Sequence, residues 1–187
     1  VAVHLRIAAY LCGLGEIGWS KMFLTKRLGP RQRIGIIITE AALEPDPIMK
    51  PGTLCNRCMA CVRECPAGAI PRDRSVKVRL GGYDVEWADI DIARCDLCFR
   101  GAERREEGDR APYYLDGAQA EKSKPGWWSP FYHKPRNLYN TGQAVCGARG
   151  CTRACMIALE ARGAVDNRFK QPFRRRPPWR VDWEKMK

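Results

Sequence analysis

The sequence predicts an α+β protein in which a short α/β segment precedes a cysteine-rich domain. Three observations lead to this prediction. A glycine motif and a run of isoleucines lie within the first 50 residues, a regularly spaced cysteine motif begins at Cys55, and two alternating stretches flank Gly81-Gly82. The chain of 187 residues is long enough to bury a core, since chains of this size hide roughly 70% of their unfolded surface.

Residues 1–50 have the pattern of an α/β segment. Residues 20–28 begin with a serine that can cap a helix, and Gly-Pro follows them, so we expect a helix there. The β-branched run at residues 34–38 predicts a short buried strand. Three prolines and a glycine in residues 44–52 then mark a linker to the next domain.

The glycine motif Gly13-x-Gly15-x-x-Gly18 matches the dinucleotide-binding fingerprint, and Glu40 ends an apolar run 22 residues later. That fingerprint should follow a clean strand and lead into a further βαβ unit, and the sequence shows neither. We therefore interpret the motif as a glycine-rich turn packed against a large planar ligand or against another backbone segment.

Residues 51–165 form the predicted cysteine-rich domain. Two period-two runs within residues 76–87 are joined by Gly-Gly, which indicates a β-hairpin. Residues 100–140 have weak periodicity and several aromatic side chains, so we expect a long insertion over the surface. A helical pattern at residues 152–162 ends at a glycine, and residues 166–187 predict a basic, extended tail.

The strongest chemical signal is the motif Cys55-x2-Cys58-x2-Cys61-x3-Cys65-Pro66, the spacing of a bacterial ferredoxin cluster loop. Thiolates at intervals of three residues can point inward from one tight loop to three corners of a [4Fe–4S] cube. Backbone N–H groups of the same loop can then face the sulfurs. The proline is expected to start the next helix, and the fourth cysteine lies too far round the loop to close the same cube.

Two [4Fe–4S] clusters need eight thiolates, and the later cysteines can supply the missing ones. Cys155 is predicted to close the first cube, as the reciprocal of Cys65. The second cube then takes Cys65 and three further cysteines, for which we predict Cys95, Cys146 and Cys151, with Cys98 as the alternative to Cys95. Cys12 stands alone in an apolar stretch and is expected to be a buried small hydrophobe.

Other uses of the ten cysteines fit the sequence less well. Zinc ribbons use paired CxxC units, and a disulfide framework is typical of smaller, loop-rich chains. Only His4 and His133 are present, which argues against a histidine-rich zinc site or a non-haem iron triad. The absence of CxxCH excludes covalently attached c-type haem.

The net charge of +12 suggests an acidic partner. Residues 162–187 carry nine Lys/Arg and three Asp/Glu, a net +6, which we interpret as a solvated basic tail rather than a nucleic-acid site. The longest apolar run is too short and too interrupted to span a membrane, so no transmembrane segment is expected. We expect a cytoplasmic protein, or a membrane-associated or exported one where an N-terminal signal has been removed.

The order of the motifs resembles a known family. The motif Gly13–Gly18, the stretch Leu28-Gly29-Pro30-Arg31-x-Arg33-Ile34-Gly35, the CxxCxxCxxxCP loop and Cys151-x3-Cys155 together look like the C-terminal half of corrinoid-dependent iron–sulfur reductases. These include reductive dehalogenases and epoxyqueuosine reductase. The resemblance covers about residues 8–72 and 90–165.

The resemblance implies part of a nitroreductase-like domain in residues 1–50, followed by a ferredoxin-like domain with two [4Fe–4S] clusters. The clusters would pass single electrons to cobalamin, with Gly15 and Gly18 as candidate corrinoid contacts. The family's catalytic acid lies upstream of the region that this chain matches, so no catalytic residue is assigned. Upstream sequence or a partner chain would complete the cobalamin site, and ferredoxin or flavodoxin would donate electrons.

Two functions follow from the sequence. The first is the iron–sulfur electron-transfer portion of a corrinoid-dependent reductase, and therefore part of an oxidoreductase. The alternative is a stand-alone two-cluster ferredoxin-type subunit without a catalytic site of its own. A simple ferredoxin has no use for the α/β segment of residues 8–40, which favours the first.

Overall fold

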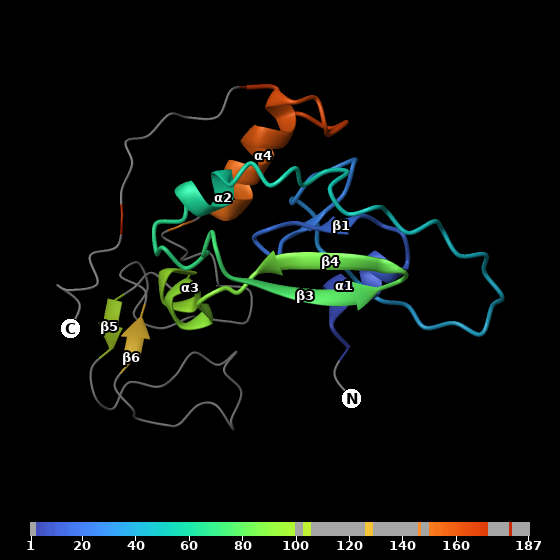
Figure 1. Ribbon diagram of the computed structural model, residues 1–187, viewed down its shortest axis with the longest axis horizontal. Coiled ribbons are helices and arrows are strands. Elements are labelled where there is room, and N and C mark those ends of the chain that lie inside the picture. The colour runs from blue at the N-terminus through green and yellow to red at the C-terminus, as the bar shows by residue number, and fades with distance from the viewer. Residues whose placement is uncertain are drawn as a thin grey trace.

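The computed structural model describes residues 3–99, 103–105, 126–128, 146, 150–171 and 180. The helices in this part of the chain are α1 (Leu5–Leu11), α2 (Ala60–Arg63), α3 (Ile92–Phe99) and α4 (Cys151–Ala161). The strands are β1 (Glu16–Ile17), β2 (Phe23–Leu24), β3 (Ser75–Leu80), β4 (Tyr83–Ala88), β5 (Glu103–Arg105) and β6 (Gly126–Trp128). These strands pair in sequence order as antiparallel, two-stranded sheets (Figure 1).

The β3–β4 hairpin confirms the prediction from the two alternating runs. Its register pairs Leu80 with Tyr83, so Gly81 and Gly82 form the two-residue turn. Both glycines have positive φ, 53° and 86°, which is the backbone that a type I′ turn requires. Side chains on one face of β4 are buried, and this face packs the hairpin onto the N-terminal part of the chain.

The N-terminal core joins α1, the β1–β2 pair and the hairpin. Its buried side chains are Ala9, Tyr10, Ile17, Phe23, Val85 and Trp87. Figure 1 shows the hairpin lying alongside α1 and β1. This core gives β1 a fixed place beside the cysteine loop that follows, here defined as residues 55–66.

A second core links the start of the chain to α4. Leu24 of β2 and Leu54, just before the cysteine loop, pack with Met156 and Leu159 of α4. Gly163 follows α4 with φ 66°, and its N–H donates to the carbonyl of Glu160, which confirms the predicted helix end. Residues on both sides of the predicted boundary at residue 50 therefore share one core.

The predicted helix over residues 20–28 is wrong. The chain instead forms β2, whose Phe23 and Leu24 pair with Ile17 and Glu16 of β1. Phe23 and Leu24 are adjacent in sequence and both are buried, so this short strand is covered on both faces. Such two-sided burial removes the alternation that would have identified a strand, and tertiary packing decides the outcome.

The predicted buried strand at residues 34–38 is also wrong. The backbone there belongs to no strand, and the Ile37 and Ile38 side chains are 92% and 93% exposed. In Figure 1 the segment between β2 and α2 extends beyond the tip of the hairpin. Cys12, expected to be buried, is exposed as well.

No helix follows Pro66, in contrast to the prediction. The N–H of Gly68 donates to the carbonyl of Cys65, and Gly68 has φ 60°, so the chain makes a turn. The next N–H, of Ala69, donates to the Cys65 Sγ at 3.4 Å. The Ala69 N–H is therefore bound by the Cys65 sulfur, whereas in a continuing helix it would donate to a main-chain carbonyl.

Some predicted features fall outside the described residues. Of the insertion at residues 100–140, only β5 and β6 are described, and Glu103 pairs with Trp128. Of the tail at residues 166–187, residues 172–179 and 181–187 lie outside. The nitroreductase-like and ferredoxin-like assignments stay predictions. Across the described residues, every helix is too short or too polar to cross a bilayer.

Candidate metal centre

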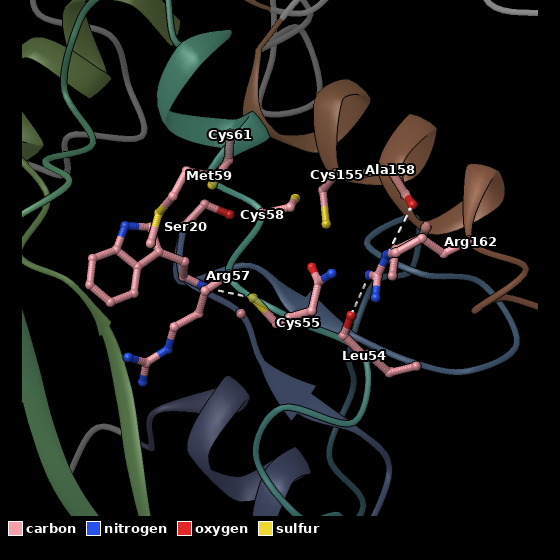
Figure 2. Close-up of a pocket in the computed structure, with 14 residues that line it drawn as sticks. Ser20, Leu54, Cys55, Arg57, Cys58, Met59, Cys61, Cys155, Ala158 and Arg162 are labelled. Atoms are coloured by element: carbon pink, nitrogen blue, oxygen red, sulfur yellow. Dashed lines mark hydrogen bonds between the residues drawn. The ribbon is translucent and has the colours of Figure 1, made fainter.

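Four cysteines surround one pocket, here called the first cysteine pocket. Cys55 and Cys58 reach it from the cysteine loop, Cys61 from α2 and Cys155 from α4. Figure 2 shows their side chains entering the same space. The structure thus brings together the four residues for which the sequence predicted a shared cube, although Cys155 is 94 residues beyond Cys61. Whether they bind a cluster stays a prediction.

Two left-handed residues shape the backbone between these cysteines. Arg57 has φ 55° and Met59 has φ 57°, conformations that residues other than glycine adopt rarely. Each costs on the order of 1 kcal/mol or more, and such strain is concentrated at functional sites. These positions turn the chain sharply on either side of Cys58.

The carboxylate of Glu16 holds the start of the cysteine loop. Glu16 is on β1, only 1% exposed, and its Oε1 accepts the N–H of Cys55. Burial raises the pKa of this carboxyl above its ordinary value, and the N–H groups of residues 52–55 offset only part of that rise by favouring the charged form. Glu16 belongs to the glycine motif, so that motif supports the cysteine loop directly.

Backbone N–H groups also face two of the sulfurs. Trp19 N–H donates to the Cys55 Sγ at 3.3 Å, and Ala69 N–H donates to the Cys65 Sγ. Donors of this kind favour a negatively charged sulfur. The Trp19 indole is fixed by its own N–H, which donates to the Pro71 carbonyl at 3.0 Å.

Burial and neighbouring thiols suppress the ionisation of two cysteines in the first cysteine pocket, Cys61 and Cys155. Burial, and then the proximity of the other cysteines, raises the pKa of Cys61 to about 12 and that of Cys155 to about 12. Without a cation these thiols are therefore neutral at pH 7. A bound metal core would replace their protons and supply the positive charge that four crowded thiolates need.

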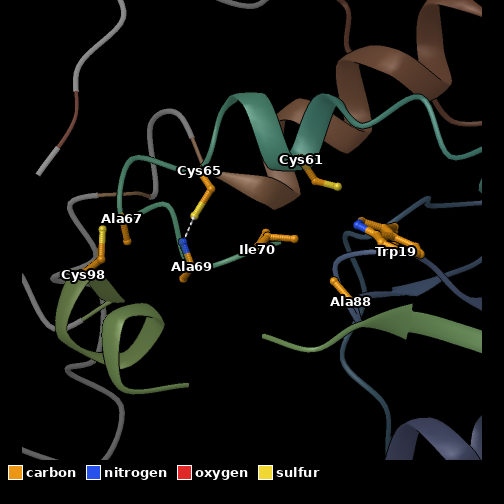
Figure 3. Packing of buried hydrophobic residues seen from close by; sticks show 8 residues of the cluster. All are labelled: Trp19, Cys61, Cys65, Ala67, Ala69, Ile70, Ala88 and Cys98. Carbon is orange, nitrogen blue, oxygen red and sulfur yellow. Dashed lines mark hydrogen bonds between the residues drawn. The ribbon is translucent and has the colours of Figure 1, made fainter. Parts of the chain in front are cut away.

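A second cysteine group consists of Cys65, Cys98, Cys146 and Cys151. Cys65 and Cys98 are buried in one hydrophobic cluster, and Cys146 and Cys151 pack against it. A hydrogen bond between the Cys98 and Cys146 side chains raises the pKa of Cys98 and lowers that of Cys146. Figure 3 shows the Cys61 sulfur directed toward Trp19 and the Cys65 sulfur directed toward Ala69. These two cysteines of the loop therefore point in different directions.

The structure buries Cys98, whereas the sequence favoured Cys95 as the ligand in the second cysteine group. Cys98 is 1% exposed within the second cysteine group, whereas the predicted ligand Cys95 is exposed. Both lie on α3, and Cys95 remains close enough to raise the pKa of Cys98. A sequence signal was available, because charged residues flank Cys95 and apolar residues flank Cys98. The ligand assignment stays a prediction.

The described residues show no preformed site for a single metal ion. Among the described residues, no three His, Cys, Asp or Glu side chains converge on one ion site. A tetrahedral zinc ion with Zn–S bonds of about 2.3 Å would draw its sulfurs to within about 4 Å of one another. A [4Fe–4S] cluster is larger than one ion, so its four thiolates lie further apart than the ligands of zinc.

The two candidate corrinoid contacts, Gly15 and Gly18, are buried against the protein itself. A Cβ on Gly15 would lie 2.0 Å from the Leu24 carbonyl oxygen, and one on Gly18 would lie 2.9 Å from the Leu24 side chain. Of the two interpretations of the glycine turn, packing against another backbone segment accounts for Gly15, while Gly18 packs against the Leu24 side chain. The corrinoid contacts remain predictions.

Comparisons with known proteins give a partial likeness. The chain is 39% identical over 72 residues to tetrachloroethene reductive dehalogenases of Desulfitobacterium hafniense and Dehalobacter restrictus. The match covers 37% of this chain and 13% of the length of each relative. No family model matches the chain. No solved structure matches it. The likeness relates part of the chain to reductive dehalogenases.

Proposed function

We propose that this chain is the iron–sulfur electron-transfer portion of a corrinoid-dependent reductase of the reductive-dehalogenase type. The observation that carries the proposal is the first cysteine pocket, where α4 brings Cys155 to the three cysteines of the loop. The partial likeness to reductive dehalogenases supports the same class of enzyme. Two [4Fe–4S] clusters, when bound, supply single-electron storage.

The chain's own residues have defined tasks in this proposal. Cys55, Cys58, Cys61 and Cys155 hold one cluster, and Cys65 belongs to the other. The N–H groups of Trp19 and Ala69 stabilise negative charge on the sulfurs. Cobalamin would lie between this chain and upstream sequence or a partner chain, and ferredoxin or flavodoxin would donate the electrons.

Iron content after anaerobic purification tests the proposal. We expect about eight iron atoms per chain and a matching amount of sulfide. Cys155→Ala should lower the iron to about half, whereas Cys12→Ala, at an exposed cysteine outside both groups, should leave it unchanged. Stoichiometric zinc with little iron would contradict the proposal.

Electron paramagnetic resonance of the reduced protein tests the division of ligands. Cys155→Ala and Cys65→Ala should disturb the signals of different clusters. If both substitutions disturb the same cluster, the ligand sets are wrong even though the chain binds iron.

The stand-alone two-cluster carrier remains the second candidate, and the packing of Gly15 and Gly18 against Leu24 favours it. Titration with cobalamin separates the two functions. We expect weak or no binding by this chain alone, and tight binding once the upstream sequence or partner chain is added. Absence of binding in both cases would favour the carrier.

A further inference from the structure

The mouth of the first cysteine pocket combines an exposed cysteine with several arginines. Cys58 is exposed, while Arg57 and Arg162 line the pocket (Figure 2). Arg63, the last residue of α2, donates from Nη1 to the Cys58 carbonyl at 2.8 Å. Arg180 donates to the Arg63 carbonyl, also at 2.8 Å, which adds another positive charge beside α2.

Most of this positive charge is directed to neutral groups. Arg162 donates to the carbonyls of Leu54 and Ala158, and Arg63 donates to that of Cys58. A main-chain carbonyl orients a guanidinium without cancelling its charge. Arg57 differs, because it pairs with Glu86. Arg63 and Arg162 are exposed, so their charge is presented to solvent around Cys58.

The two cysteine sets differ in access from solvent. In the second group Cys65 and Cys98 are buried and Cys146 and Cys151 are half-buried. The first pocket also has a buried cysteine, Cys61, but it reaches the surface at Cys58. Electron transfer between proteins requires a short path from one redox centre to the other. Among the described residues, the rim around Cys58 offers such a path together with a positive surface.

We propose that this rim, formed by Arg57, Cys58, Arg63 and Arg162, is the docking surface for an acidic one-electron carrier protein. The inference rests on the proposed function and assigns the donor to one face of the chain. Carboxylates on the carrier meet the arginines, which steers the encounter and fixes its orientation. The carrier loses one electron, the metal centre held by the first pocket gains it, and no bond is made or broken.

The experiment measures the second-order rate constant with which a reduced, acidic [4Fe–4S] ferredoxin reduces the anaerobically purified protein. Arg63→Gln removes one charge at the rim while keeping a hydrogen-bonding side chain, and Arg63→Lys keeps the charge. Arg79→Gln is the matched control, because Arg79 lies on β3 and pairs with Asp84. It changes the net charge of the protein by the same amount at another place.

At low ionic strength, Arg63→Gln should lower the rate constant about threefold to tenfold, and Arg63→Lys and Arg79→Gln less than about twofold. Added salt should remove the difference. Reduced methyl viologen, a small cation, should reduce all variants at the same rate. Equal slowing by Arg63→Gln and Arg79→Gln, or no dependence on salt, would overturn the docking surface.

The visible absorption of each preparation keeps the two proposals distinguishable. Variants with wild-type iron–sulfur absorption but an unchanged ferredoxin rate would overturn the docking surface alone. A wild-type protein without iron–sulfur absorption would overturn the proposed function and the docking surface with it.

Discussion

The two ends of the cysteine loop are held by different side chains, an acidic one at the start and a basic one at the end. At the start, Glu16 accepts the N–H of Cys55, and at the end, Arg180 donates to the carbonyls of Cys65 and Arg63. Each side chain suits its backbone partner, because a carboxyl oxygen accepts from the Cys55 N–H and a guanidinium donates to the carbonyls of Arg63, the last residue of α2, and Cys65. Both side chains come from distant parts of the sequence.

The two anchors differ in their surroundings. Glu16 is buried, so a change there leaves N–H groups without an acceptor and a gap in the core. Arg180 is exposed, so water can replace it at the carbonyls. The start of the loop therefore depends on the protein's interior, and its end depends on a surface contact that water can replace.

Glu16→Ala should have the largest effect on stability, and it tests directly whether the Glu16 contact is stronger than the Arg180 contact. It should lower the free energy of unfolding by about 3 kcal/mol, because it combines a cavity with unpaired N–H groups. Thermal or urea unfolding of the anaerobic protein measures the change. Glu44→Ala, at an exposed position, is the control and should change stability by less than about 0.5 kcal/mol. A similar small change for Glu16→Ala would contradict the anchoring role.

The cysteines of the first pocket and of the second group should differ in their rate of reaction with a thiol reagent. In metal-free protein at pH 8, iodoacetamide should modify Cys146 at least about tenfold faster than Cys61 or Cys155. The thiolate is the reactive form, and the hydrogen bond with Cys98 lowers the pKa of Cys146, whereas burial raises those of Cys61 and Cys155 to about 12. Mass spectrometry of the labelled peptides measures the order in which the three cysteines are modified.

The same pKa shifts predict the pH dependence of this labelling. Raising the pH from 8 toward 12 should accelerate modification of Cys61 and Cys155 more than that of Cys146, because the pKa of Cys146 is lowered and those of Cys61 and Cys155 are raised to about 12. Cys98→Ala should lower the rate at which iodoacetamide modifies Cys146 several-fold, because it removes the hydrogen-bond partner of Cys146. Equal rates at all three cysteines would show that the two groups do not differ.

Arg180→Ala should have the smallest effect. We expect a loss of less than about 1 kcal/mol in the free energy of unfolding, because the side chain is exposed. Unfolding of the anaerobic protein measures it, and Arg180→Lys should recover part of the loss. A loss as large as that of Glu16→Ala would remove the distinction between an interior and a surface anchor.

The sequence predicted the parts of the site that depend on local spacing. The cysteine motif indicated a tight loop, and the structure brings Cys55, Cys58 and Cys61 to one pocket. Sequence spacing does not distinguish Cys95 from Cys98 as a ligand, because the two are three residues apart on one helix. Only the packing of α3 decides which of them is buried. Glu16 was missed as an anchor because its partner lies 39 residues away.

Local sequence was sufficient to predict the Gly81-Gly82 hairpin and the end of α4 at Gly163, since positive φ and strand alternation are properties of a few adjacent residues. Three other features depend on contacts between distant segments. Residues 23–24 form a strand, Ile37 and Ile38 are exposed, and Glu16 and Arg180 hold the cysteine loop. These outcomes depend on which distant segments meet, and local preferences of less than about 1 kcal/mol per residue yield to such packing.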